Sequence, residues 1–214
     1  MGYGTNSENT LPTTFFKING LKKGSTEIFF EGKTKVGDSY VKIDEKPSKI
    51  FGHLTSVSVK EFEFEEETHK AVRLVIDSAD DRVILEGGFS NVMVNVINTL
   101  AGNTEAIDKV EFGVYISKTG YPSISISING GTWEDNKWKF DYAKKLKPLI
   151  EETKDKKGKV VSTDKTSLID FLVKEIESDG FQTKIKGTPP AQTVKSQEAP
   201  AEIEAHPEDD DLPF

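Results

Sequence analysis

Aromatic residues and lysines recur two positions apart in this sequence. Phe15 precedes Lys17 in one such pair, and Tyr40 precedes Lys42 in another. Residues two apart share one face of a β-strand, so each ring is expected beside an ammonium group on the polar side of its strand. This combination suits single-stranded nucleic acid, because bases stack on aromatic rings while lysines contact phosphates. Taken alone, each ring could instead lie on an ordinary strand surface, where Tyr is common, or be covered by the C-terminal helices.

The segment VEFGVYISKTGYPSISISING (residues 110–130) predicts a hairpin with the same combination. Its apolar residues share one face, while Tyr115 and Tyr121 share the polar face with small serines, and Lys118 stands at the turn. A further ring and two lysines follow the hairpin. The candidate single-stranded DNA contacts are therefore Phe15, Lys17, Tyr40, Lys42, Tyr115, Lys118, Tyr121, Trp133, Lys137 and Lys139.

Little in the sequence points to catalysis. It has no GxxxxGK[ST], GxSxG or HExxH motif, and its three His residues lack metal-ligand spacing. The absence of Cys excludes a disulfide framework, a thiolate zinc site and a Cys nucleophile, and it fits a reducing compartment. The carboxylates of Asp77, Asp80, Asp81 and Glu86 could bind two metal ions, and a nuclease of this kind is the alternative. Turn chemistry alone accounts for the stretch IDSADDRV, so we expect no catalytic residue, no metal site and no cofactor.

Short alternating runs punctuated by Gly, Asp and Asn predict a mainly β body. The expected strands are Thr14–Asn19, Thr26–Phe30, Ser39–Asp44, Leu54–Glu65, Lys70–Asp77 and Arg82–Glu86. A helix is expected over residues 90–102, with Ser90 as its N-cap. In LTSVSVKEFEFEEE the apolar parity changes between Lys60 and Glu61, which predicts a bulge there. Five or more strands, one inserted helix and a bent long strand favour an OB-fold-like small β-barrel over residues 1–140, with a β-sandwich as the alternative.

Residues 141–186 are expected to form a helical extension packed on the barrel. One helix is expected over residues 141–159, interrupted at Pro148, and TSLIDFLVKEIESDG predicts another with a single apolar stripe. Such a stripe usually packs on its own domain, and a partner-binding helix is the alternative. Residues 187–208 are rich in Pro, Ala, Gln and Glu, and are expected to be a disordered linker.

The net charge of −8 is unevenly distributed. Seven acidic residues against one lysine lie beyond residue 187, so the preceding body is close to neutral. Eight lysines within residues 17–49 and nine within residues 137–159 allow local contact with a phosphate backbone. The N-terminus lacks the basic and apolar regions of a secretory signal, and no apolar run approaches the roughly 18 residues that span a membrane. The sequence therefore predicts a cytoplasmic protein without membrane contact.

The chain ends in DDDLPF, the hexapeptide formed by Asp209, Asp210, Asp211, Leu212, Pro213 and Phe214. This ending, behind a polar linker, resembles the tails of single-stranded DNA-binding proteins of bacteria and their phages. The resemblance implies an OB barrel that coats and protects single-stranded DNA in replication and recombination. It also implies an acidic tip that recruits replication, recombination or repair enzymes. The Lys-rich extension and the N-terminal strands look more like a phage version, which would act in the host cell cytoplasm.

The chemistry of the hexapeptide agrees with this resemblance. Phe214 can insert its ring into an apolar pocket while its α-carboxylate pairs with a cation at the rim. The alternative for these six residues is a solubilising acidic end. For the whole chain, the alternatives are a module that binds protein or glycan, and a metal-dependent nuclease.

Overall fold

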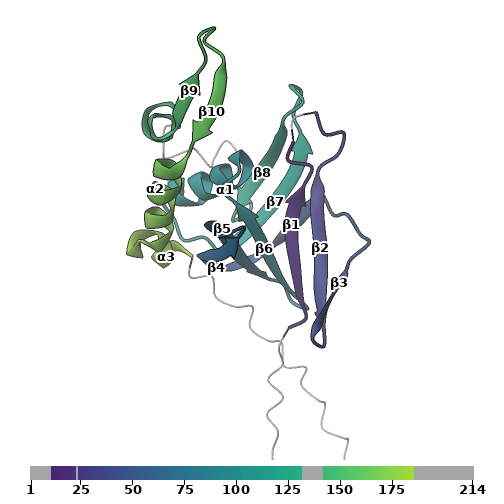
Figure 1. Ribbon diagram of the computed structural model, residues 1–214. Helices are drawn as coiled ribbons and strands as arrows, with labels where there is room; N and C mark the ends of the chain where they lie inside the picture. The colour runs from purple at the N-terminus through teal and green to yellow at the C-terminus, as the bar shows by residue number, and fades with distance from the viewer. Residues whose placement is uncertain (1–10, 23, 132–141, 186–214) are drawn as a thin grey trace, which may run out of the picture.

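The computed structural model describes residues 11–22, 24–131 and 142–185. Among these residues, eight strands form one open mixed sheet in the order β3-β2-β1-β6-β5-β4-β7-β8 (Figure 1). The strands are β1 (Thr13–Asn19), β2 (Phe29–Val36), β3 (Ser39–Lys42), β4 (Lys49–Phe64), β5 (Glu67–Asp77), β6 (Arg82–Gly88), β7 (Lys109–Ile116) and β8 (Pro122–Ile128). The prediction of a mainly β body is therefore confirmed.

The described strands do not close into a barrel. All neighbouring strands are antiparallel except β1 and β6, which pair in parallel with Phe15 beside Ile84. Because β1 occupies the free side of β6, the sheet continues through β2 and β3 instead of closing on itself. The edges among the described strands are β3 and β8.

The long strand β4 contains a bulge, but not where the sequence predicted it. The register with β5 shifts between Leu54 and Ser56, and the buried side changes there from Leu54 to Val57. Between Lys60 and Glu61 the ladder is continuous, so that predicted position was wrong. The apolar residues change sides at that point because the strand extends beyond the core from residue 60 onward. The phenylalanines in this part of the strand are exposed.

The helix α1 (Asn91–Gly102) lies against the inner face of the sheet and confirms the helix expected over residues 90–102. The Ser90 side chain accepts a hydrogen bond from the Met93 backbone N–H at 3.3 Å, which is the expected N-cap contact. Ten of its twelve residues are buried, which makes it the centre of the core. Its β-branched residues are tolerated because tertiary packing outweighs their low helix propensity.

The C-terminal region contains α2 (Thr166–Glu177) and α3 (Asp179–Lys184). Leu168, Leu172 and Ile176 are fully buried and belong to the same apolar cluster as the sheet and α1. The stripe of α2 therefore packs on the body of the protein. The predicted second helix ends three residues before Gly180, because Ser178 caps α3 by accepting from the Phe181 N–H.

The predicted helix over residues 141–159 was largely wrong. A π-helical turn (Tyr142–Leu146) and a 3₁₀ turn (Lys147–Leu149) are followed by a hairpin of β9 (Glu151–Lys154) and β10 (Val160–Asp164). Pro148 cannot continue a helix, and the Asp155 carboxylate accepts from the backbone N–H groups of Lys157 and Lys159 at 2.8 and 2.9 Å, which closes the turn. This hairpin, residues 151–164, is called the arm.

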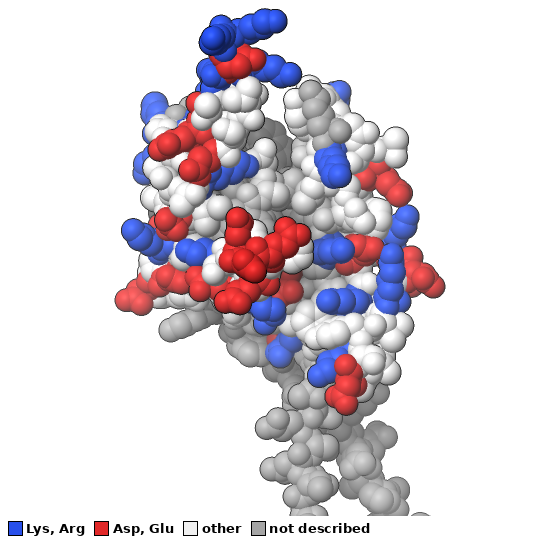
Figure 2. Space-filling model, viewed as in Figure 1, with Lys and Arg blue, Asp and Glu red and all other residues white. Residues whose placement is uncertain are grey.

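The arm projects away from the sheet and the helices (Figure 1). Lys and Arg side chains gather at its end, at the top of Figure 2. No helix among the described residues is long and apolar enough to cross a membrane.

Candidate nucleic-acid interface

The first group of candidate residues lies on the outer face of β1, β2 and β3, opposite the core. Residues directly opposite each other in a sheet share a face. Phe15 pairs with Lys33, which pairs in turn with Lys42 of β3. Lys17 pairs with Glu31, and Tyr40 with Lys35. The predicted aromatic and basic residues of these strands are therefore neighbours, and we call Phe15, Lys17, Glu31, Lys33, Tyr40 and Lys42 the β1–β3 cluster.

Two aromatic rings form the centre of this cluster. Phe15 and Tyr40 are 5.5 Å apart between ring centroids and meet edge to face, with planes at 82°. Lys33 places its Nζ atom 4.6 Å from the centroid of the Tyr40 ring. Tyr40 is still 52% exposed, so its ring remains open to a flat ligand. An exposed ring held by an edge contact and a cation is positioned for stacking.

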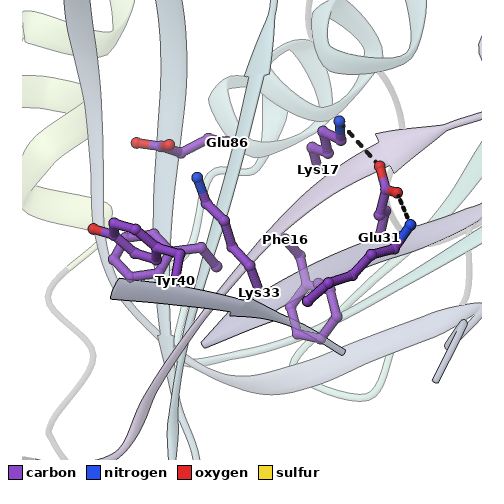
Figure 3. A pocket seen from close by; sticks show the side chains of 9 residues that line it. Phe16, Lys17, Glu31, Lys33, Tyr40 and Glu86 are labelled. Atoms are coloured by element: carbon purple, nitrogen blue, oxygen red, sulfur yellow. Dashed lines mark ion pairs between the residues drawn. The ribbon is translucent and has the colours of Figure 1, made fainter. Parts of the chain in front are cut away.

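Glu31 is the residue of this cluster that the sequence analysis missed. Its carboxylate forms ion pairs with Lys42 at 2.8 Å and with Lys17 at 3.0 Å. Dashed lines in Figure 3 mark the ion pairs of Glu31. The hydrogen bond from Lys42 is the largest cause, and that from Lys17 the next, of a pKa of Glu31 that is lowered to about 2. The same contact raises the pKa of Lys42. The predicted strand ended at Phe30, one residue short of Glu31, and a longer strand would have placed Glu31 on the polar face without showing its pairing with Lys17.

A cavity of about 320 Å³ opens within the cluster. It is lined by Phe15, Phe16, Lys17, Glu31, Gly32, Lys33, Tyr40, Lys42 and Glu86 (Figure 3). Gly32 is required here because a Cβ atom would stand 2.6 Å from the Phe16 ring. The volume falls at the lower end of the range for small-molecule sites. The cavity walls thus combine aromatic rings, lysines and the carboxylates of Glu31 and Glu86.

The second group of candidate residues lies on the outer face of the β7–β8 hairpin. Tyr115 and Tyr121 are each 49% exposed, and Lys118 is exposed in the connecting turn. Tyr115 lies opposite Ser123, and the Ser125 hydroxyl donates to the Gly113 carbonyl at 3.1 Å. Small side chains between the tyrosines leave the face low enough for an extended chain to approach.

Phe51 is a further exposed ring that the sequence analysis did not select. It is 68% exposed on β4 and lies opposite Glu111 of β7. A cavity of about 390 Å³ beside it is also lined by His53 and Lys109. The predicted strand began at Leu54, so Phe51 fell outside it. Phe51 alternates with Ile50, which is buried on the opposite side of the strand, and this alternation could have identified Phe51 as an outward-facing ring.

The segment between β3 and β4 is hydrogen-bonded to β2 on one side and to β7 on the other, and these strands belong to the two groups. The Phe30 N–H donates to the Pro47 carbonyl, and the Val114 N–H donates to the Ser48 carbonyl, both at 2.9 Å. The sheet is therefore curved enough for β2 and β7 to lie on either side of this connection.

The lysines near this connection are paired with glutamates. Lys46 lies 3.2 Å from Glu27, and Lys49 lies 2.6 Å from Glu111. Lys17 and Lys42 share the single carboxylate of Glu31, and Lys33 contacts the Tyr40 ring and, among the described residues, no carboxylate. The predicted basic track is therefore partly compensated by glutamates, and lysines outnumber glutamates in the β1–β3 cluster.

The remaining predicted residues cannot be placed. Trp133, Lys137 and Lys139, and the hexapeptide at residues 209–214, lie outside the described residues.

Three of the four carboxylates of the nuclease alternative take part in local contacts. Glu86 pairs with Arg73 at 2.5 Å. Asp77 is buried and pairs with Arg82 at 2.7 and 2.9 Å, and Ser78 bonds to Asp81 in the same turn. Within the described ranges, no three His, Asp or Glu side chains are grouped to hold a metal ion.

Comparison of the chain with protein-family models, with curated proteins and with solved structures finds no match.

Proposed function

We propose that this protein binds single-stranded DNA without sequence preference, along the outer face of its sheet. It would coat and protect exposed strands in replication and recombination, and it would recruit partner enzymes through residues 209–214. The observation that carries this proposal is the placement of Tyr40, Tyr115 and Tyr121 on that face, each about half exposed and accompanied by lysines. Stacking on rings contributes about 1–3 kcal/mol per base and tolerates any sequence.

The ion pairs indicate how such binding would be balanced. A phosphate that approaches Lys17 or Lys42 must compete with the Glu31 carboxylate, which each lysine contacts at 3.0 Å or less. Stacking would therefore supply more of the binding free energy than charge neutralisation. The salt dependence of binding should be correspondingly modest for a protein with this many lysines on its surface.

The arrangement of β4 to β8 supports an OB-type ancestry for this part of the sheet. Three antiparallel strands are followed by α1 and then by a hairpin whose first strand returns to pair with β4. The long first strand carries a bulge, as a strand that serves two halves of a barrel must. We infer that an N-terminal unit of three strands has been added along β6, at the side where a barrel would otherwise close.

A fluorescence titration with oligo(dT) tests DNA binding directly, because the chain contains two Trp and five Tyr as reporters. Quenching that saturates and that weakens as salt increases is the expected result, since phosphate contacts release counterions. Oligo(dT) that leaves the fluorescence unchanged at low salt would contradict the proposal. A glycan or a protein that bound in its place would instead favour the alternative of a binding module.

The hexapeptide requires a separate experiment with two variants. Deletion of residues 209–214 removes three aspartates and is expected to tighten oligo(dT) binding, most clearly at low salt. Phe214→Ala retains those charges, so DNA affinity should hardly change while docking to replication enzymes is lost. Weaker DNA binding after the deletion would show that these residues do not compete with DNA. Intact docking by Phe214→Ala would make the hexapeptide only an acidic end.

A further inference from the structure

Two exposed features outside the proposed DNA-binding face have complementary chemistry. The first is the end of the β4–β5 hairpin, residues 61–69, which we call the acidic end. The second is the arm. The acidic end is rich in glutamate, and the end of the arm, residues 154–159, is rich in lysine. Each of these charged ends lies beside exposed apolar side chains.

The acidic end holds five glutamates and exposed phenylalanines. The glutamates are Glu61, Glu63, Glu65, Glu66 and Glu67, all of which are exposed. Asp and Glu side chains gather at the centre of Figure 2, where Figure 1 brings this hairpin toward the viewer. Phe62 and Phe64 are 42% and 59% exposed, and both rings lie beside His69, with centroids 5.6 and 6.1 Å away. Large rings exposed together mark an interaction surface more often than single ones do.

The turn of the acidic end is built from residues that fit it poorly. Glu65 and Glu66 have φ angles of 51° and 65°, in the left-handed region that two-residue hairpin turns normally fill with Asn and Gly. The strands are joined there at a conformational cost, while two carboxylates are held at the outermost point of the hairpin.

The arm has the opposite charge at its end. Lys154, Lys156, Lys157 and Lys159 surround one aspartate, and every residue of β9 and β10 is exposed. Val160 and Val161 are exposed beside these lysines. A two-stranded ribbon that buries no side chain of its own strands is marginally stable in water. Its stability is therefore expected to increase when a partner covers it.

We propose that the arm of one copy of this chain docks on the acidic end of another copy. Lysines would face the glutamates of residues 61–67, and Val160 and Val161 would cover Phe62 and Phe64. DNA phosphates could pair with the lysines, but they would leave the valines exposed. A protein partner is therefore favoured over DNA for the arm. The two surfaces differ, so the contact is head to tail and continues from copy to copy instead of closing a dimer.

The contact is small, and free copies should associate weakly and with strong dependence on salt. If the proposed DNA binding holds, copies on one strand would be held at high local concentration, and the contact would make coating cooperative. The docking itself does not depend on DNA, so it is tested without it.

A charge exchange tests this proposal by sedimentation velocity of the full chain at low salt. The arm variant carries Lys156→Glu and Lys157→Glu, and the end variant carries Glu63→Lys, Glu65→Lys and Glu66→Lys. The wild type should associate increasingly with concentration, each variant alone should remain monomeric, and an equimolar mixture should associate again. Only the mixture joins an acidic arm to a basic end and a basic arm to an acidic end.

A third variant guards against misfolding. Glu65→Asn with Glu66→Gly removes two charges while supplying the residues that the turn prefers, so reduced association by this variant cannot be attributed to loss of the fold. A wild type that stays monomeric, variants that associate alone, or a mixture that stays monomeric would each overturn the proposal. So would an arm variant that loses oligo(dT) binding while its self-association is unchanged, because the arm would then be a DNA contact.

Discussion

The β1–β3 cluster and the acidic end both expose aromatic rings at the surface, but their charges have opposite sign. Tyr40 and Phe15 are accompanied by three lysines, two of which share Glu31. Phe62 and Phe64 are accompanied by glutamates, with His69 between their rings. Bases could stack on either set of rings, because stacking requires only an open π-face. The phosphates of the same strand would be attracted to one region and repelled by the other.

Exposed rings alone therefore do not identify a nucleic-acid interface. The neighbouring charges decide which ligand a ring can reach, since the rings and phosphates of a DNA strand arrive together. The same reasoning assigns a cationic partner to the acidic end. Substitutions that remove a ring or a charge from each region test whether the two surfaces bind different ligands.

The largest effect is expected from removal of a ring on the proposed DNA face. Tyr40→Ala, Tyr115→Ala and Tyr121→Ala should each weaken oligo(dT) binding by about 1–3 kcal/mol, with little loss of folding stability because each residue is half exposed. Phe64→Ala is the matched control in the acidic region and should bind as the wild type does. Fluorescence titrations measure all four variants. Equal losses for Tyr40→Ala and Phe64→Ala would remove the distinction between the regions.

The next effect concerns the carboxylate that holds two lysines. Glu31→Gln should tighten oligo(dT) binding and steepen the plot of log K against log[salt] by up to about 0.7 for each lysine that gains a phosphate. Glu66→Gln changes the net charge equally at the acidic end and serves as the control. An unchanged slope in Glu31→Gln would show that Lys17 and Lys42 do not contact the backbone.

A single lysine at the β7–β8 turn should have a smaller effect. Lys118→Gln is expected to flatten the salt plot by about 0.7, the value for one phosphate contact on a single strand. Lys42→Gln should flatten it less, because Lys42 is already paired with Glu31 at 2.8 Å. The reverse order of the two slopes would place the backbone over β3 and not over the turn.

The smallest effect is on acid stability. The pKa of Glu31 falls from 4.5 to about 2 in the folded chain, so its ion pairs contribute fully above about pH 4.5 and are lost as the pH falls toward 2. Glu31→Gln should therefore lose less stability than the wild type across that window. Urea unfolding at several pH values between about 5 and 2.5 measures this difference. Parallel decreases for both proteins would show that the ion pairs do not stabilise the fold.

Local periodicity accounts for the parts of this protein that were predicted correctly. The alternation of Tyr40 with Lys42, and of Tyr115 with its serines, placed both tyrosines on the outer face before any strand pairing was known. Ser90 and the apolar spacing that follows it identified α1, and the stripe through Leu168, Leu172 and Ile176 identified the buried side of α2. These features depend on residues within a few positions of one another.

The errors in β4 arise where distant segments meet, and the error in the arm arises within one short segment. Nothing near residue 60 could show that β4 leaves the core there, or that its bulge lies at residue 55 and turns Phe51 outward. The lysine-rich segment after residue 150 has helical residues, yet the turn centred on Asp155 folds it into the arm. Propensity was outweighed in the second case by a proline and a turn.

The polar side of the outer strands, the positions of α1 and α2, and the division of charge between body and C-terminus follow from the amino-acid sequence. The parallel pairing of β1 with β6, which leaves the sheet open, and the position of Glu31 between Lys17 and Lys42 follow from the folded structure. The physical reason is one of range. The side to which a residue points repeats every two positions along a strand, whereas its neighbour across the sheet depends on register between segments far apart in the chain.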